Sequence, residues 1–390
     1  MHRLPTRYVH LDAARARFGE ARVARFGALF WRGDPLADAA VASLAERPRA
    51  AREALIDRCL REGVARVDDA PEAVRAFFAE LDEVPFWVDP ERIARGGAFF
   101  LRAGILGGLV LGTYSLVAGY CSPAGNKPLM FSGRLEDDVP RRLAETSRFV
   151  QAVSLPGGMA RGGAGFAATV KVRLIHAAVR TMLARSPRWN EAAWGLPINQ
   201  VDMSGTALLF SYIVLDGLDK FGFHATPQER EDFLHLWRYV AWLIGVDESL
   251  RCTSLDEART LWELLSMTQG PPDDDSRALA RALIESGDRQ ARDPAARFRA
   301  LRMKAVGYAI SRYMLGDAYA DGLGYPSKGA LAHLIPLFRH FHARAGATLR
   351  VLPDLPFATP EAGARYWETI VNTALQGVPA SFAMPEQLRV

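Results

Sequence analysis

Apolar and polar residues follow each other with the 3.6-residue period of amphipathic helices along most of the chain. Several of these periodic segments begin with a capping side chain, either before a proline suited to the first helical turn or three residues before a glutamate. These starts are Asp34-Pro35, Asp89-Pro90, Thr226 with Glu229, and Ser254 with Glu257. The last two predict helices that run to about Gly245 and through Leu265.

Helix ends and loops are also marked in the sequence. Stops are expected at Gly222, after a helical run from Met203, and around Gly322-Gly324. Segments rich in glycine, proline and aspartate predict loops at Ser122–Lys127, Pro156–Gly165 and Gly270–Asp275. Strand-like alternation is convincing only at Thr348–Pro353. We therefore predict an all-α protein, with residues 1–390 forming one large helical domain.

The segment Ala103–Cys121 contains nineteen residues without a charge, which is long enough to span a bilayer. Five of the nineteen are glycine, and the charges that flank the segment give no clear topology signal. A helix buried on all sides in a large helical protein has the same composition. We favour the buried helix, and we keep membrane association through this segment as the alternative.

Composition limits the function classes. Hydrophobic residues make up 49% of the chain, which is enough for a large core, and the formal net charge is +4. Arginine accounts for 43 of the 48 basic residues, but the arginines are scattered among acids, so we expect no nucleic-acid partner. The three cysteines are far apart, and the first residues include no apolar signal segment. We therefore expect a cytoplasmic protein.

The most informative helix is predicted over Phe166–Ala184. It is apolar almost all round, apart from Lys171 and one polar stripe. At about 100° per residue, the members of the stripe fall within an arc of roughly 60°. They are Thr169, Arg173, His176 and Arg180.

Two interpretations of this stripe stay open. Buried arginines need anions, and carboxylates from other helices can supply them. The propionates of a haem can supply them as well, with His176 as the axial ligand of the iron. Positive charge on both sides would keep the imidazole neutral, as a metal ligand must be.

A second predicted helix begins near Asp138. Arg142 and Thr146 are four residues apart and share one face with Phe149 and Val153. Such a face could wall a haem on the side where dioxygen binds, because its donors would orient dioxygen while its apolar part excludes water. An ordinary amphipathic helix with surface arginines explains the same pattern.

The segment VRLIHAAVR around His176 resembles the haem-ligand helix of the latex-clearing (rubber oxygenase) family and of the related oxygenase of mycophenolic acid biosynthesis. Other segments resemble this family in the same order, and the resemblance extends over about residues 27–325. They are Trp31–Ala39, Val84–Gly97, Ser122–Leu135, Trp194–Thr206 and Leu234–Glu248. The resemblance implies a globin-like helical core around haem b, and oxygenase activity.

The resemblance also assigns roles to residues. It implies that His176 is the proximal iron ligand and that Arg173 and Arg180 are flanking arginines needed to retain the haem. It implies that Arg142 and Thr146 are the distal arginine and threonine. Arg312, in a late helix, is a further candidate for a haem-side arginine.

Two departures from the family pattern change the expected substrate. Rubber-cleaving members carry a distal lysine where this chain has Glu145, and a glutamate near the position of Asn126. We therefore expect dioxygen and a small hydrophobic, unsaturated substrate rather than a polymer, with cleavage of a double bond, hydroxylation or a peroxidase-like step as the reaction. The alternatives are a haem-binding sensor or carrier without turnover, and a member that has lost the cofactor, in which Arg173 and Arg180 pair with acids.

Overall fold

The computed structural model describes residues 4–131, 139–287, 293–327, 334–341, 344, 359–376, 378, 380 and 382. Helices follow one another throughout these ranges, and no strand occurs in them, which confirms the all-α prediction. The expected strand at Thr348–Pro353 lies outside the described residues. The single-domain organisation stays a prediction.

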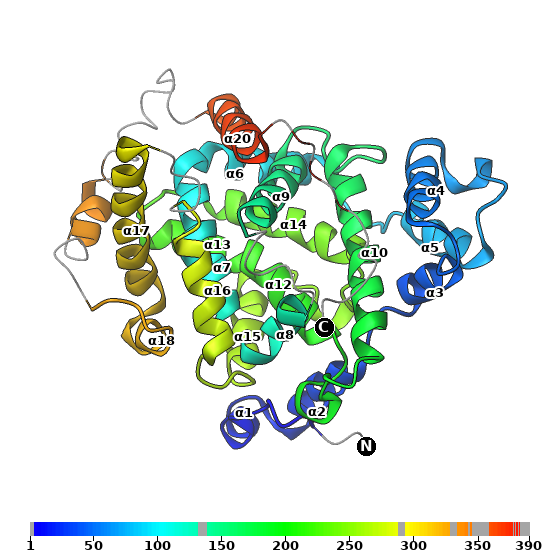
Figure 1. Cartoon of the computed structure of the whole chain (residues 1–390), viewed down its shortest axis with the longest axis horizontal. Coiled ribbons are helices and arrows are strands. Elements are labelled where there is room, and N and C mark those ends of the chain that lie inside the picture. Colours follow the sequence, from blue (N-terminus) through cyan, green and yellow to red (C-terminus); the bar gives the residue numbers. More distant parts are fainter. Residues whose placement is uncertain are drawn as a thin grey trace.

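Within the first 82 residues of the chain, the elements are short helices and 3₁₀ turns. They are α1 (Leu11–Phe18), α2 (Glu20–Ala28), η1 (Leu29–Trp31), α3 (Pro35–Ser43), α4 (Arg49–Glu62), η2 (Val64–Arg66) and α5 (Glu72–Asp82). Figure 1 shows α3, α4 and α5 grouped at one end of the molecule, with α10 between them and most of the remaining helices. Helix α3 packs against both α5 and α10.

The central part of the chain supplies most of the long helices. They are α6 (Pro90–Val110), η3 (Leu111–Ser115), α7 (Leu116–Tyr120), α8 (Pro123–Phe131), α9 (Val139–Ser154), α10 (Ala164–Ala184), α11 (Glu191–Trp194), α12 (Gln200–Phe210), α13 (Tyr212–Lys220), α14 (Pro227–Leu243), η4 (Glu248–Leu250) and α15 (Leu255–Ser266). The last elements are α16 (Asp274–Ile284), α17 (Pro294–Leu315), α18 (Asp317–Gly322) and α20 (Pro360–Leu375), and residues 334–341 are also helical.

The expected helix starts are confirmed by their caps. The Asp34 and Asp89 carboxylates accept hydrogen bonds from backbone N–H groups in the first turns of α3 and α6. Thr226 and Glu229 form the full capping box of α14, and Ser254 caps α15. Each of these side chains satisfies backbone donors that have no partner inside the helix.

Two local predictions are wrong. The expected loop at Ser122–Lys127 is largely the first half of α8, because the Ser122 hydroxyl accepts from the Gly125 N–H and Pro123 occupies the first helical turn. The helical run from Met203 is interrupted at Ser211, whose backbone angles (φ −109°, ψ −82°) separate α12 from α13. The expected loops at Pro156–Gly165 and Gly270–Asp275 are largely confirmed, although α10 already begins at Ala164 and α16 at Asp274.

Helix α6 is central to the core, where it packs against α14, α20 and α9. Its neighbours can approach because Gly96 and Gly97 face backbone rather than side chains. A Cβ at Gly96 would lie 2.4 Å from the Asp232 carbonyl oxygen of α14, and one at Gly97 would lie 2.3 Å from the Ser154 carbonyl oxygen of α9. Phe100, next along α6, stacks on Phe233 with ring centroids 6.0 Å apart.

The uncharged segment Ala103–Cys121 forms the end of α6, a single π-turn (η3) and α7. By length and composition, Pro90–Tyr120 and Gln200–Lys220 could each cross a membrane, yet 56% and 61% of their apolar windows are buried inside the molecule. In this structure the uncharged segment packs within the protein, as a buried helix is expected to do. Gly104 interrupts it with a φ of +49°, a conformation that other residues rarely adopt.

Candidate functional site

A mainly apolar cavity of about 810 Å³ lies between the central helices. Its wall includes residues of α7, α8, α9, α10, α12 and α14, so segments far apart in the chain meet around it. Leu116, Gly119, Tyr120 and Cys121, at the end of the uncharged segment, belong to this wall. The volume is within the range of about 300–1,000 Å³ that is usual for small-molecule and cofactor sites.

Helix α10 contributes Val172, Ile175, His176 and Val179 to the cavity wall. Their spacing of three and four residues places them on one face of the helix. The Nδ1 atom of His176 is inaccessible and has no hydrogen-bond partner among the described residues. Only Nε2 of this imidazole is therefore available to a ligand in the cavity.

The pKa of His176 is lowered to about 4, first by burial and then by the positive charge of Arg180, while Asp34 opposes the shift. The imidazole is therefore neutral near pH 7 and keeps a free lone pair. A neutral histidine with an accessible nitrogen is the form that binds iron or another metal ion.

Arg173 lies on the neighbouring face of α10 and is 3% exposed. Its guanidinium donates to both carboxylate oxygens of Asp34, at 2.6 and 3.0 Å, and to Glu80 at 3.1 Å. It also lies over the ring of Phe77, 5.0 Å from the centroid. These partners come from the start of α3 and from α5, so Arg173 ties α10 to the N-terminal helices.

Arg180 is held in the same way one turn beyond His176. Its guanidinium donates to Asp38 of α3 at 2.9 Å and to the Ile198 carbonyl oxygen at 2.7 Å. The sequence left open whether protein carboxylates or haem propionates pair with Arg173 and Arg180. In the structure both arginines bind protein carboxylates. Neither arginine lines the cavity, and their role in haem retention stays a prediction. His176 is at the edge of the polar stripe and faces the cavity, whereas the arginines turn away from it.

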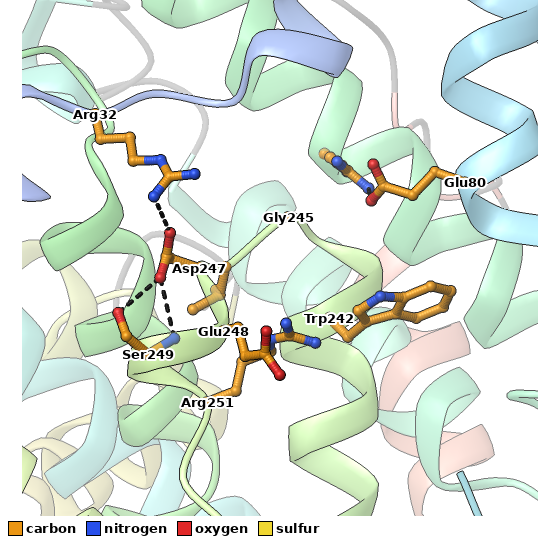
Figure 2. Close-up of a pocket in the computed structure, with 10 residues that line it drawn as sticks. Arg32, Glu80, Trp242, Gly245, Asp247, Glu248, Ser249 and Arg251 are labelled. Carbon is orange, nitrogen blue, oxygen red and sulfur yellow. Dashed lines mark hydrogen bonds and ion pairs between the residues drawn. The ribbon is translucent and has the colours of Figure 1, made fainter. Parts of the chain in front are cut away.

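On the arginine side of α10 is a second, polar pocket of about 590 Å³ (Figure 2). Arg173, Arg32 and Arg251 line it together with three acidic residues, Glu80, Asp247 and Glu248. Figure 2 shows Arg32 paired with Asp247, which also accepts hydrogen bonds from Ser249. Because the basic and acidic residues of this lining are equal in number, the pocket has no excess charge that would select an ion.

Arg142 and Thr146 both line the central cavity from α9, so the structure brings them together with His176 around one space. Burial raises the pKa of Tyr120, and the positive charge of Arg142 offsets part of that rise. The guanidinium and the hydroxyl are hydrogen-bond donors in a mainly apolar space. They can orient a small polar ligand there.

The two residues that depart from the family pattern also line the cavity. Glu145 accepts a hydrogen bond from Arg141 at 3.2 Å. Asn126 is 1% exposed and donates to the Tyr120 carbonyl oxygen at 2.8 Å and to the Ser276 hydroxyl at 3.1 Å. Asn126 therefore joins α8 to α16, a structural role that a carboxylate could not fill with the same donors.

Arg312 is held by acceptors of the protein itself, and its role as a haem-side arginine stays a prediction. It is buried near the end of α17, where its guanidinium binds Asp321 at 2.7 Å and the carbonyl oxygens of Tyr325 and Pro326 at 2.8 Å. It does not line the central cavity. Its sequence environment did not show that α18 and the following turn fold back to supply these acceptors.

One polar cluster of the cavity was missed in the sequence. The Tyr114 hydroxyl donates to Asp216 at 2.7 Å and accepts from the Lys220 ammonium group at 2.9 Å. Burial raises the pKa of Tyr114, and the carboxylate of Asp216 adds to the shift. Asp216 and Lys220 are four residues apart on α13, and this spacing was the available signal.

His235 has a structural role in the described part of the chain. His235 accepts a hydrogen bond from the Asp89 N–H at 3.2 Å and packs edge-on against Trp87. His333 and His342 lie outside the described residues. No group of three histidine, cysteine or acidic side chains that could hold a metal ion occurs within the described ranges.

The fold and the cavity together define an all-α protein with a buried, mainly apolar ligand site. Residues 102–343 match the catalytic domain of the family described as ER-bound oxygenase mpaB/B'/rubber oxygenase, and the chain belongs to this oxygenase family. It is 26% identical to the rubber oxygenase of Streptomyces sp. (strain K30) over 310 residues, which cover 77% of this chain and 73% of that protein. The expected family is thereby confirmed.

The fold has also been seen in a solved structure. Latex clearing protein LCP in its closed state superposes with a TM-score of 0.70, covering 93% of each chain at 23% sequence identity. This similarity confirms the expected fold class.

Proposed function

We propose that this chain is a haem b-dependent oxygenase that cleaves a carbon–carbon double bond in a small hydrophobic substrate. The observation that carries the proposal is His176, a neutral histidine in the wall of a large apolar cavity with its Nδ1 buried and unpartnered. A metal held by side chains alone needs several ligands, whereas a porphyrin brings four nitrogens and needs only an axial histidine.

The residues around the cavity fit a haem in part. His176 would hold the iron, and the apolar side chains Val172, Ile175 and Val179 would contact the ring system. The basic residues that line the cavity, within the described residues, are Arg142 and Lys220. Lys220 is already held by Asp216 and the Tyr114 hydroxyl, and Arg142 has the role of a hydrogen-bond donor in the cavity, so the part of the fit that is missing is an assigned cation for the propionates.

The bound haem would supply the activation of dioxygen. The side chains of this protein have other tasks: Arg142 and Thr146 donate hydrogen bonds into the cavity, and the apolar wall excludes water and takes up the hydrocarbon substrate. Cleavage of one double bond by dioxygen gives two carbonyl groups and balances without a further reductant.

A small substrate is proposed because of Glu145. The Streptomyces relative is named for its action on rubber, but this chain has a carboxylate in the cavity wall at the position where the family resemblance implies a lysine in rubber-cleaving members. The change of charge alters the donors available in the cavity. We infer an unsaturated isoprenoid- or lipid-like molecule rather than polyisoprene.

A cofactor-free family member is the second candidate. In such a member Arg173 and Arg180 would pair with protein acids, and both arginines do so in this structure. This candidate gives no reason for a large cavity with an unpartnered histidine in its wall. Absorption spectroscopy separates the two candidates.

The test is an absorption spectrum of protein produced with a haem precursor, for the wild type, His176→Ala and His235→Gln. We expect a strong Soret band in the wild type that is lost in His176→Ala and kept in His235→Gln, because His235 does not line the cavity. A folded wild type without a Soret band after haem addition would overturn the proposal. If the band is present, dioxygen uptake with unsaturated lipids then distinguishes an oxygenase from a haem-binding sensor or carrier.

A further inference from the structure

Helical residues 334–341 turn an apolar face to solvent. The side chains at positions i, i+3, i+4 and i+7 are Leu334, Leu337, Phe338 and Phe341, which are 55%, 52%, 47% and 64% exposed. Ile335, only 8% exposed, packs into the main core and fixes the orientation of the helix. An amphipathic helix in a soluble protein normally buries such a face.

The first half of α17 carries further exposed apolar side chains. Phe298, Leu301 and Met303 are 61%, 60% and 58% exposed. The exposed arginines Arg297, Arg299 and Arg302 are interspersed with them, and no acidic residue occurs from Pro294 to Leu315. Phe298 and Leu301 share one side of the helix, with arginines flanking them.

Figure 1 shows α17 and residues 334–341 (orange) at the same end of the molecule, opposite to α4 and α5. We call the two segments together the basic apolar end: the seven apolar side chains named above, with Arg297, Arg299, Arg302 and Arg339. Exposed apolar residues gathered with basic ones mark an interaction site more often than an ordinary surface.

We propose that the basic apolar end docks on the lipid–water interface of an anionic membrane. Helices with exposed phenylalanine and leucine beside arginine are typical of interfacial binding, in which the apolar side chains enter the acyl boundary and the cations meet lipid phosphates. The whole chain has a net charge of only +4, so this end concentrates positive charge locally.

The same charges disfavour a second copy of the chain as the occupant. A two-fold symmetric dimer would place this patch against itself and bring the arginines of both copies together. An anionic lipid surface relieves that repulsion, whereas another basic apolar end adds to it.

The position of the basic apolar end in the fold also fits an apolar ligand in the central cavity. Met314 and Leu315, at the opposite end of α17, line the central cavity, so one helix joins the proposed membrane contact to the cavity wall. The membrane proposal does not require the oxygenase proposal, and either can fail without the other.

The test is sedimentation of the full chain with vesicles of phosphatidylcholine alone or mixed with phosphatidylglycerol. We compare the wild type with two variants. One is Leu337→Gln with Phe341→Gln, and the other replaces Arg297, Arg299 and Arg302 by glutamine. Matched controls are Phe86→Gln, at a fully exposed phenylalanine that follows α5, and Arg61→Gln with Arg66→Gln at the opposite end of the molecule. Circular dichroism checks that every variant is folded.

We expect the wild type to bind the anionic vesicles in a salt-sensitive manner. Each basic residue near an anionic surface contributes about fivefold, so the triple arginine variant should bind roughly 100-fold more weakly. The variant with Leu337→Gln and Phe341→Gln should lose more than about tenfold in vesicle affinity. The control variants should bind vesicles like the wild type. Absence of binding, equal binding to neutral vesicles, or binding unchanged in both variants would overturn the proposal. Concentration-dependent dimers that are abolished by Leu337→Gln with Phe341→Gln, without vesicle binding, would instead assign the surface to a second copy of the chain. That result would also overturn the proposal.

Discussion

The residue that organises the site is His176, and its neighbours on α10 set its chemistry from a distance. The imidazole faces the cavity, while Arg173 and Arg180 face the N-terminal helices and bind Asp34, Glu80 and Asp38. The arginines therefore position α10, and the charge of Arg180 also helps to keep His176 neutral. They do so without lining the cavity.

The buried pair of Arg173 and Asp34 gives a prediction for stability. Both side chains are 5% exposed or less, and Asp34→Asn leaves the buried guanidinium with Glu80 as its remaining acidic partner, while the side-chain oxygen can still cap α3. Breaking such a pair costs about 3–5 kcal/mol. We expect a loss of roughly 3 kcal/mol in the free energy of unfolding, because Glu80 remains as a partner.

The matched control is Asp38→Asn, since Asp38 is 33% exposed and its partner Arg180 keeps the Ile198 carbonyl oxygen. A loss of only about 1 kcal/mol is expected there. Urea unfolding of both variants measures the difference. Equal losses in the free energy of unfolding would contradict the argument that burial makes the Asp34 pair more costly to break.

Local helical spacing predicted some site residues, whereas others depend on tertiary packing that the sequence does not show. Local spacing placed His176, Arg142 and Thr146 on cavity-facing helix sides, because helical periodicity is a local property. The partners of Arg173, Arg180 and Arg312 were not predictable, because they depend on which other elements pack nearby. The sequence left the anion open in the first two cases, and only tertiary contacts could decide it.

At the scale of elements, caps were predicted better than interruptions. Asp34, Asp89, Thr226 and Ser254 act within their own first turns, so their sequence signals are complete. The break at Ser211 had no such signal, and its hydroxyl instead binds the Ala207 carbonyl oxygen. Helix contacts such as those of α6 were beyond the reach of local patterns.

The close contact of α6 with α9 gives a prediction at this scale. Gly97→Ala would place a Cβ 2.3 Å from the Ser154 carbonyl oxygen, so the two helices must separate. Overpacking of this kind costs about 1–3 kcal/mol, and we expect a loss in that range by thermal or urea unfolding. Gly112→Ala is the control, since its Cβ would meet nothing within 4 Å and alanine favours helix. A control that destabilises as much as Gly97→Ala would contradict the packing explanation.

At the scale of the whole molecule, the candidate site is a cavity that no single element contains. Helices α7, α8, α9, α10, α12 and α14 contribute to its wall, and α3 and α5 hold α10 in place from the other side. The family resemblance predicted a helical core around a buried site, but not which elements form its wall. Hydrophobic periodicity alone predicted helices without their relative placement.

Stability against acid is a property of the whole fold, and two buried histidines should govern its first decline. The pKa values of His176 and His235 are both lowered to about 4, mainly by burial, from an ordinary value of 6.5. Between these values the unfolded chain binds protons that the folded chain excludes. The free energy of unfolding therefore falls as the pH drops from about 6.5 toward 4.

Each histidine contributes at most about 3 kcal/mol to this decline. We expect haem-free protein to lose stability steeply across this window in urea unfolding. A variant with His176→Gln and His235→Gln should lose much less, because neither glutamine can take up a proton. Carboxylates such as Asp232, whose pKa is lowered by its arginine partners, add their own decline only at lower pH. If the wild type and the variant lose stability in parallel, the histidines are not the groups that limit the fold in acid.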